Sequence, residues 1–181
     1  MIFHRRLSLF TLLALLLFSG CSRPPSINQA SPGRTRWSVY FSPHGGCTDA
    51  IVEALGKAHE SVLVQAYSFT SAPIAKALAE AKHRGADVRI ILDKSNLTER
   101  YSPVDFFLHS GIPPLIDSAH AIAHNKVMVL DHRTVITGSF NFTRAAEERN
   151  AENLLIIDDA NLAARYEKNW ELHASHSEKY E

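Results

Sequence analysis

Apolar and polar residues alternate along this chain in short blocks that are typical of successive strands and helices. Apolar runs rich in β-branched residues indicate strands, whereas longer segments of mixed polarity indicate helices. The predicted strands cover residues 37–41, 61–67, 88–92, 113–116, 126–130, 134–137 and 153–157. The predicted helices cover residues 48–59, 72–84, 104–109 and 161–172. This alternation predicts an α/β fold with a mixed, mostly parallel β-sheet flanked by helices on both faces.

The N-terminus has a different pattern, in which Arg5 and Arg6 precede an apolar stretch at residues 7–18. This stretch is shorter than the roughly 20 residues that span a bilayer. A basic start followed by a short apolar core indicates a signal peptide at residues 1–20. The run Leu-Phe-Ser-Gly-Cys resembles a bacterial lipobox, which implies cleavage before Cys21 and lipid attachment to its sulfur. Simple secretion and an uncleaved anchor are the alternatives, and each places the domain outside the cytoplasm, in the periplasm or cell envelope.

The rest of the chain divides into a tether, one domain and a tail. Residues 21–36 contain Pro, Ser, Asn and Gly and few apolar residues, which indicates a flexible tether. Residues 37–175 suffice for one domain with its own core, and residues 176–181 are a predicted C-terminal tail. Cys47 is the only cysteine of this domain. Burial at the start of a helix is the favoured interpretation, and a disulfide between subunits is the alternative.

The first part of a chemically informative motif begins a predicted hairpin. His124 and Lys126 flank one asparagine and lead into the strand at residues 126–130, and Asp131 begins the turn that follows. Because alternate residues of a strand share a face, His124 and Lys126 are expected to lie on one side.

The second part of the motif ends the partner strand of this hairpin, where Gly138 and Ser139 are followed by Phe-Asn. Gly138 indicates a bulge or a close approach of two backbones. Ser139 and Asn141 share a face, since they are two residues apart. The hairpin is therefore expected to direct the histidine, the lysine, the serine and the asparagine at one point.

These groups suit chemistry at a phosphodiester. A neutral imidazole such as that of His124 can attack phosphorus and form a covalent phosphohistidine. A lysine offers a point charge to the phosphate oxygens, and an asparagine amide offers neutral donors to them. Such donors stabilise the charge that develops on those oxygens during the reaction.

The spacing His-x-Lys-x4-Asp, followed by Gly-Ser-x-Asn, resembles the signature of the phospholipase D superfamily. The run at residues 138–157 is similar to the small single-motif endonucleases that bacteria have in this superfamily, and the resemblance extends over about residues 36–170. It implies a phospholipase D-like fold. It also implies that His124 is the nucleophile or its twin general acid, and that Lys126 and Asn141 bind phosphate.

The resemblance assigns further roles around this centre. Ser139 corresponds to a polar support, and Glu152 corresponds to the acidic residue that orients the histidine ring, with a surface charge as the alternative. Glu147 and Glu148 are better candidates for surface charges. Asp131 belongs to the motif but is expected to hold the turn. Ser68 ends a strand and is expected to line the cleft, with packing at the strand end as an equal alternative.

A phosphohistidine mechanism requires two histidines, one to attack and one to protonate the leaving oxygen. The chain has a single copy of the motif, because its other histidines lack the following lysine and Gly-Ser-x-Asn. The sequence therefore predicts a two-fold homodimer in which both copies of His124 meet. No His/Cys cluster has the spacing of a zinc site, so neither a metal nor another cofactor is expected.

The net charge says little about function, because 19 Lys and Arg residues balance 19 Asp and Glu residues. Two of these cations lie in the predicted signal peptide. Nucleic-acid-binding proteins often have a basic excess, so any basic surface here is local. The candidates for the rim of the cleft, with ordinary solvated charges as the alternative, are Lys94, Arg100, Arg133, Arg144 and Arg149.

Together these features predict an exported, metal-independent endonuclease that hydrolyses DNA, and they leave RNA open as a further substrate. A phospholipase D-type phospholipid hydrolase or transphosphatidylase is the alternative, because the reaction centre is the same and a membrane anchor places lipid head groups within reach. A non-catalytic, membrane-tethered module that binds nucleic acid is the third hypothesis. The predicted partners are nucleic acid, a second copy of the chain and the membrane.

Overall fold

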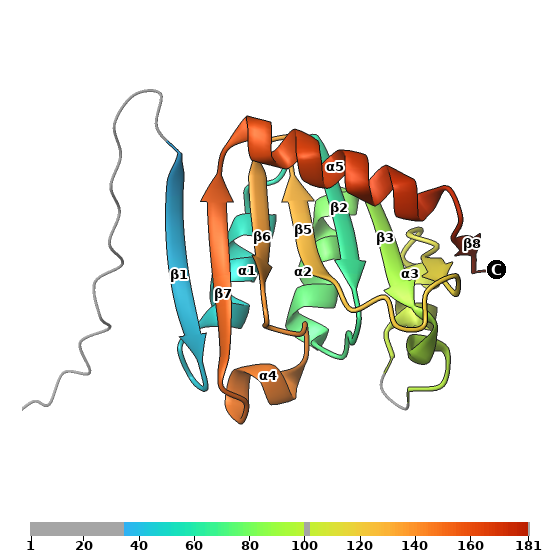
Figure 1. Ribbon diagram of the computed structural model, residues 1–181, viewed down its shortest axis with the longest axis horizontal. Coiled ribbons are helices and arrows are strands. Elements are labelled where there is room, and N and C mark those ends of the chain that lie inside the picture. The colour runs from blue at the N-terminus through green and yellow to red at the C-terminus, as the bar shows by residue number, and fades with distance from the viewer. Residues whose placement is uncertain (1–34, 100–101, 181) are drawn as a thin grey trace, which may run out of the picture.

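The computed structural model describes residues 35–99 and 102–180, which form a single eight-stranded sheet with helices on both faces (Figure 1). The strands are β1 (Arg36–Ser42), β2 (Ser61–Ala66), β3 (Asp87–Asp93), β4 (Leu115–Asp117), β5 (Lys126–Leu130), β6 (Thr134–Gly138), β7 (Glu152–Asp158) and β8 (Glu178–Lys179). The helices are α1 (Cys47–Gly56), α2 (Ala72–His83), the short 3₁₀ helix η1 (Lys94–Leu97), α3 (Val104–His109), α4 (Arg144–Glu148) and α5 (Ala160–Ala174).

The strand order is β1-β7-β6-β5-β2-β3-β4-β8. Only the β2–β3 and β3–β4 pairs are parallel, and the other neighbours run antiparallel. The α/β fold with helices on both faces is confirmed, but the predicted mostly parallel pairing is wrong. The reason is that the second half of the chain turns back as the β5–β6 hairpin and then inserts β7 between β6 and β1.

Two apolar cores hold the helices against the sheet. The larger lies between the sheet and the pair α1 and α2, which cover the rear face in Figure 1. The smaller lies under α5, which crosses the front face and buries Trp170. The indole Nε1 of Trp170 donates a hydrogen bond to the Val64 carbonyl oxygen at 2.8 Å, so this ring fixes α5 to β2 as well as filling the core.

The predicted strands and helices are all present, with ends that differ by a few residues. The sequence did not predict η1, α4 and β8. These elements are short, and their hydrophobic pattern is too brief to identify them. β8 lies within the segment expected to be a C-terminal tail and pairs with β4.

The start of α1 depends on a residue expected to be a surface charge. The carboxylate of Glu147, on α4, accepts hydrogen bonds from the backbone N–H groups of Gly46 and Thr48 at 3.0 and 2.8 Å. Glu147 therefore satisfies donors that the N-terminus of α1 leaves free. Beside it, Cys47 is fully buried, which confirms the favoured interpretation. Burial, aided by the negative charge of Glu147, raises the pKa of the Cys47 thiol to about 12.

The turn between β5 and β6 is held by Asp131. This residue and His132 have positive φ angles of 49° and 55°, which give the tight reversal between the strands. The Asp131 carboxylate accepts hydrogen bonds from the backbone N–H groups at residues 59, 60 and 61, at 2.8 to 3.2 Å. Burial alone would raise the pKa of Asp131, but these donors outweigh it and hold the pKa below its usual value. The turn is thereby tied to the start of β2.

Within residues 35–99 and 102–180, no helix has both the length and the apolar character needed to span a membrane. The predicted signal peptide and Cys21 lie outside the described residues.

Replacing Asp131 with Asn should lower the free energy of unfolding at pH 7 by about 2 kcal/mol, because backbone donors lose a charged acceptor. The pKa of Asp131 in the folded state lies below the reference value of 3.8. Its stabilisation is therefore complete above the unfolded-state pKa and is lost as the pH falls through the lower folded-state pKa. Urea unfolding at neutral and acidic pH measures this. Asp87→Asn, an exposed carboxylate on β3, is the control, and equal losses in both variants at pH 7 would contradict the account.

Candidate active site

The motif segments meet at one edge of the sheet because of the strand register. Lys126, the first residue of β5, pairs with Ala66, the last residue of β2. Gly138, the last residue of β6, pairs with Leu154 near the start of β7. Antiparallel neighbours thus place the start of β5, the end of β6 and the start of β7 at the same edge, which is the lower edge in Figure 1.

His124 and Lys126 are in direct contact at this edge. The Lys126 Nζ atom donates a hydrogen bond to the His124 carbonyl oxygen at 2.8 Å. The imidazole of His124 is exposed and packs against the ring of Tyr67, with 4.5 Å between ring centroids. The Lys126 Nζ atom lies 4.9 Å from the same Tyr67 ring. A reactive imidazole thus stands open to solvent beside a fixed positive charge.

Lys126 is an unusual lysine, because it is only 8% exposed. Burial lowers the pKa of its ammonium, and the negative charge of Glu152 partly offsets this effect. An ammonium has three N–H donors, and the His124 carbonyl uses one of them. Two of its N–H donors therefore remain beyond this hydrogen bond.

The segment from Gly138 to Asn141 is held by β7. The backbone N–H groups of Ser139 and of the next residue both donate to the Asn153 carbonyl oxygen at 3.1 Å. Gly138 has a φ of 147°, and a Cβ atom there would lie 2.3 Å from that same oxygen. Only glycine permits this close approach, which accounts for its place in the motif. The Ser139 hydroxyl accepts a hydrogen bond from the Asn153 backbone N–H at 3.1 Å.

Asn141 sits between two fully buried aromatic residues, Phe140 and Phe142, that anchor its segment in the core. The backbones of Phe142 and Phe69 form an isolated parallel β-bridge. The Phe142 carbonyl oxygen also accepts hydrogen bonds from the loop that follows β2. The Asn141 Oδ1 atom is buried and has no hydrogen-bond partner among the described residues. Buried polar atoms are nearly always paired, so Asn141 retains hydrogen-bonding capacity that the described residues do not use.

Glu152 begins β7 at the same edge, but no hydrogen bond joins it to His124 in the described part of the chain. Its Oε1 atom accepts a hydrogen bond from the Asn150 side chain at 3.2 Å, and its charge acts on Lys126. The predicted role of Glu152 as the group that orients the imidazole therefore stays a prediction.

Sequence reasoning missed a buried carboxylate that supports the segment before His124. Asp93 ends β3, and its Oδ2 atom accepts a hydrogen bond from the Ala123 backbone N–H at 2.7 Å. A carboxylate at the end of an apolar strand was the signal that could have identified it. Ser68, expected to line the cleft, is half-buried and donates a hydrogen bond to the Glu99 carboxylate at 3.1 Å.

The five basic residues proposed for the rim do not form one group. Arg133 precedes β6 and forms an ion pair with Asp158, so it lies at the opposite edge of the sheet and its assignment to the rim is wrong. Lys94 donates a hydrogen bond to the His120 carbonyl oxygen. Arg144 begins α4 and Arg149 follows it, and both are exposed. Arg100 lies outside the described residues.

The sequence shows no His/Cys cluster with the spacing of a zinc site, but the fold gathers four potential metal ligands from distant segments. Asp117, His120, His173 and His176 place four ligand atoms within 4.8 Å of one another. Their spacing in the sequence does not resemble a zinc motif, because two segments more than fifty residues apart contribute them. This cluster contains none of the motif residues.

Comparison with known proteins identifies the family. Residues 51–173 match the family model described as "Cardiolipin synthase, PLD-like domain". The chain is 46% identical over 143 residues to "Phospholipase D" of Rickettsia conorii, an alignment that covers 79% of this chain and 72% of that relative. It is 28% identical over 156 residues to "Mitochondrial cardiolipin hydrolase" of Chlamydomonas reinhardtii, covering 86% of this chain and 70% of that relative.

A solved structure shares both the fold and much of the sequence. Nuc from Salmonella typhimurium, a phospholipase D family member, matches with a TM-score of 0.78 and 39% identity. The match covers 81% of this chain and 99% of that chain. The chain therefore belongs to the phospholipase D superfamily of phosphodiesterases, in its Nuc-like, single-motif branch, as the motif at residues 124–141 predicted.

Proposed function

We propose that this chain is an exported, metal-independent endonuclease that hydrolyses DNA, with RNA as a second substrate, without strong sequence preference. The observation that carries the proposal is the exposed imidazole of His124 beside the buried ammonium of Lys126. This pairing supplies a nucleophile and a fixed charge for the phosphate oxygens. The single copy of the motif favours a nuclease of the Nuc-like branch over a lipid-processing enzyme with two copies.

The proposed reaction has two steps that share one pair of histidines. First, the unprotonated ring nitrogen of His124 attacks phosphorus, while the leaving oxygen takes a proton from the imidazolium of the partner's His124. The bond from phosphorus to that oxygen breaks, and a phosphohistidine remains. Water then attacks the phosphorus and gives its proton to the partner's His124, and the bond to the His124 nitrogen breaks.

The other motif residues stabilise charge in this proposal. Lys126 directs its free N–H donors at the phosphate oxygens, and the Asn141 amide adds neutral donors. Ser139 supports the pocket from the end of β6. The predicted role of Glu152 is to orient the imidazole, and its charge also favours the protonated form of Lys126.

The two-histidine reaction requires a homodimer, and the surface around His124 supports one. Ile122 is 57% exposed only two residues before His124, and Leu97 is 50% exposed on η1. η1 lies beside the loop that carries His124, since Lys94 donates to a carbonyl oxygen in that loop. Apolar side chains exposed next to a reactive residue favour a contact between two copies of the chain at this edge.

The proposal that the protein is exported rests on its N-terminal sequence alone. The basic start, the short apolar core and the lipobox-like run at Cys21 support an enzyme attached to the cell envelope by lipid. Secretion without lipid remains the alternative, and both place the nuclease outside the cytoplasm.

A phospholipid substrate is the second candidate, because the names of two relatives point to it. The Rickettsia relative is named a phospholipase D, and the Chlamydomonas relative a cardiolipin hydrolase. His124 would attack the phosphorus of a phospholipid phosphodiester in the same way. A non-catalytic binding module is disfavoured, since every motif residue is present and His124 is exposed.

The full-length protein should degrade plasmid DNA in the presence of EDTA, and His124→Ala should lower the rate by about 10³-fold or more, because it removes the nucleophile. His83→Ala, an exposed histidine at the end of α2, is the matched control and should keep full activity. Electrophoresis of the digested plasmid measures the rates. Activity that EDTA abolishes and magnesium restores would contradict metal independence. If the protein leaves DNA intact but cleaves phospholipid vesicles through His124, the lipid function replaces the nuclease.

Replacing Ile122 with Glu should convert the dimer to a monomer and lower DNA cleavage at least about tenfold, because each site then lacks the second histidine. Leu172→Glu, at a residue 63% exposed on α5, is the matched control and should change neither property. Sedimentation velocity and the plasmid assay measure the two properties on the same samples. A monomeric variant with full activity per chain would rule out the shared site.

A further inference from the structure

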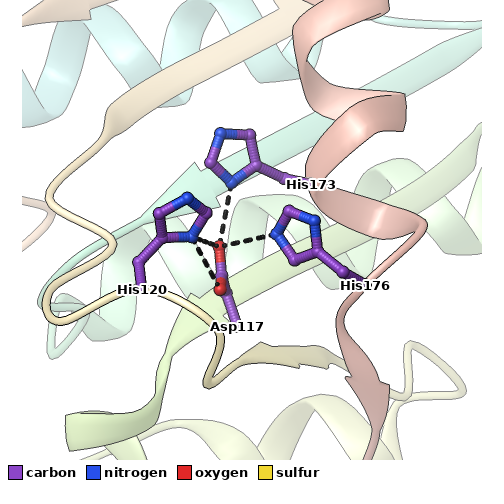
Figure 2. Close-up of side chains that lie close together, drawn as sticks. All are labelled: Asp117, His120, His173 and His176. Atoms are coloured by element: carbon purple, nitrogen blue, oxygen red, sulfur yellow. Dashed lines mark hydrogen bonds and ion pairs between the residues drawn. The ribbon is translucent and has the colours of Figure 1, made fainter.

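Four polar side chains outside the motif converge where the end of β4 meets the C-terminal end of α5 (Figure 2). Asp117 ends β4 and is fully buried, whereas His120 lies in the loop that follows and is exposed. His173 lies in the last turn of α5, and His176 lies between α5 and β8. In Figure 2 the three imidazole rings surround the carboxylate of Asp117.

The distances within this cluster suit a small cation. The ring nitrogens of His173 and His120 lie 2.9 and 3.0 Å from Asp117 carboxylate oxygens, and that of His176 lies 3.5 Å away. All four ligand atoms lie within 4.8 Å of one another. Zinc binds imidazole nitrogen and carboxylate oxygen at roughly 2.0–2.2 Å, so tetrahedral ligands are about 3.3 Å apart. The cluster already has nearly this spacing around its carboxylate.

We propose that Asp117, His120, His173 and His176 form a tetrahedral binding site for one zinc ion. Three imidazoles and one carboxylate are a donor set that zinc accepts. As hydrogen-bonded here, the nearest ring nitrogens face the carboxylate. The same nitrogens carry inward lone pairs in the other neutral tautomer, so zinc binding requires a change of tautomer and a shift of the side chains rather than a rearranged fold.

The surroundings of the cluster favour entry of the ion. His120 and His176 are exposed, so a cation reaches the site from solvent and these two rings are free to adjust. The backbone also holds Asp117, because its Oδ1 atom accepts a hydrogen bond from the Ala119 N–H at 3.2 Å. A buried carboxylate held in one orientation, with two exposed histidines in front of it, offers the ion one fixed ligand and two ligands at the solvent side.

The site joins three parts of the chain. It connects the end of β4, the loop that contains His120, and the C-terminal end of α5 next to the two-residue β8. The same loop continues to His124, four residues after His120. Asp93 and Lys94 already hold this loop through Ala123 and the His120 carbonyl.

Zinc at this position would therefore stabilise the segment that carries the nucleophile without contacting the phosphate. Contacts with Asp117 already gather the three histidines, so the segment keeps its place when zinc is chelated. The proposed zinc is thus structural and is compatible with cleavage in EDTA. The inference does not depend on which phosphodiester the enzyme hydrolyses.

Calorimetric titration of zinc into the full-length protein, purified without a histidine tag and stripped with EDTA, tests the proposal. One zinc should bind per chain. Single variants His120→Ala and His176→Ala change exposed side chains, so they should fold, and each should weaken binding at least about tenfold because a ligand is lost. His83→Ala and His124→Ala should bind zinc as the parent does. Absence of binding, or equal binding by all four variants, would overturn the proposal.

Two further readouts are independent of activity. Cobalt in place of zinc should give the intense visible absorption of tetrahedral coordination, and His120→Ala should lose it. Zinc should also raise the melting temperature of the parent and leave that of His120→Ala unchanged, because only a ligand bound to the folded state stabilises it. A weak cobalt spectrum typical of six ligands, or equal thermal shifts in both proteins, would refute the tetrahedral site.

Discussion

The buried ammonium of Lys126 is the constraint on which the active edge of the sheet depends. A charge removed from water is costly unless other groups compensate it. Here the His124 carbonyl accepts a hydrogen bond from it, the Tyr67 ring lies against it, and the Glu152 carboxylate offsets the effect of burial. These partners come from the segment before β5, the end of β2 and the start of β7. Stabilising one cation therefore requires three segments to meet at one place.

The antiparallel centre of the sheet makes this meeting possible. Because β5, β6 and β7 run in alternating directions, the beginning of the motif and its Gly-Ser-x-Asn end lie at the same edge. Asp131 fixes the opposite end of the hairpin by binding the backbone at the start of β2. Gly138 lets β6 approach β7 closely enough for Ser139 to bind the Asn153 backbone. The motif thus includes two residues, Asp131 and Gly138, that position the strands.

Local patterns predicted the local structure well, and failures occur where distant segments meet. The motif spacing predicted the family and the hairpin, and the apolar runs predicted the strands from β1 to β7. The pairing directions were wrong because the pattern of a strand does not encode its neighbour: β1 pairs with β7, more than one hundred residues away. The Asp117 cluster was missed for the same reason, since His173 lies 56 residues from its carboxylate partner. Tyr67 was overlooked beside Ser68, because only the fold shows which residue touches His124.

The central claim is that His124 forms a covalent bond to the phosphorus of the substrate, and chemical trapping tests it most directly. A short DNA duplex with radiolabelled internal phosphates would be mixed with excess full-length protein, quenched in alkaline denaturant during the first turnover, and digested for mass spectrometry. The account predicts a label that is stable in alkali, is lost in acid and maps to His124, as phosphohistidine requires. Label on another side chain, or rapid cleavage with no label on the protein, would contradict it.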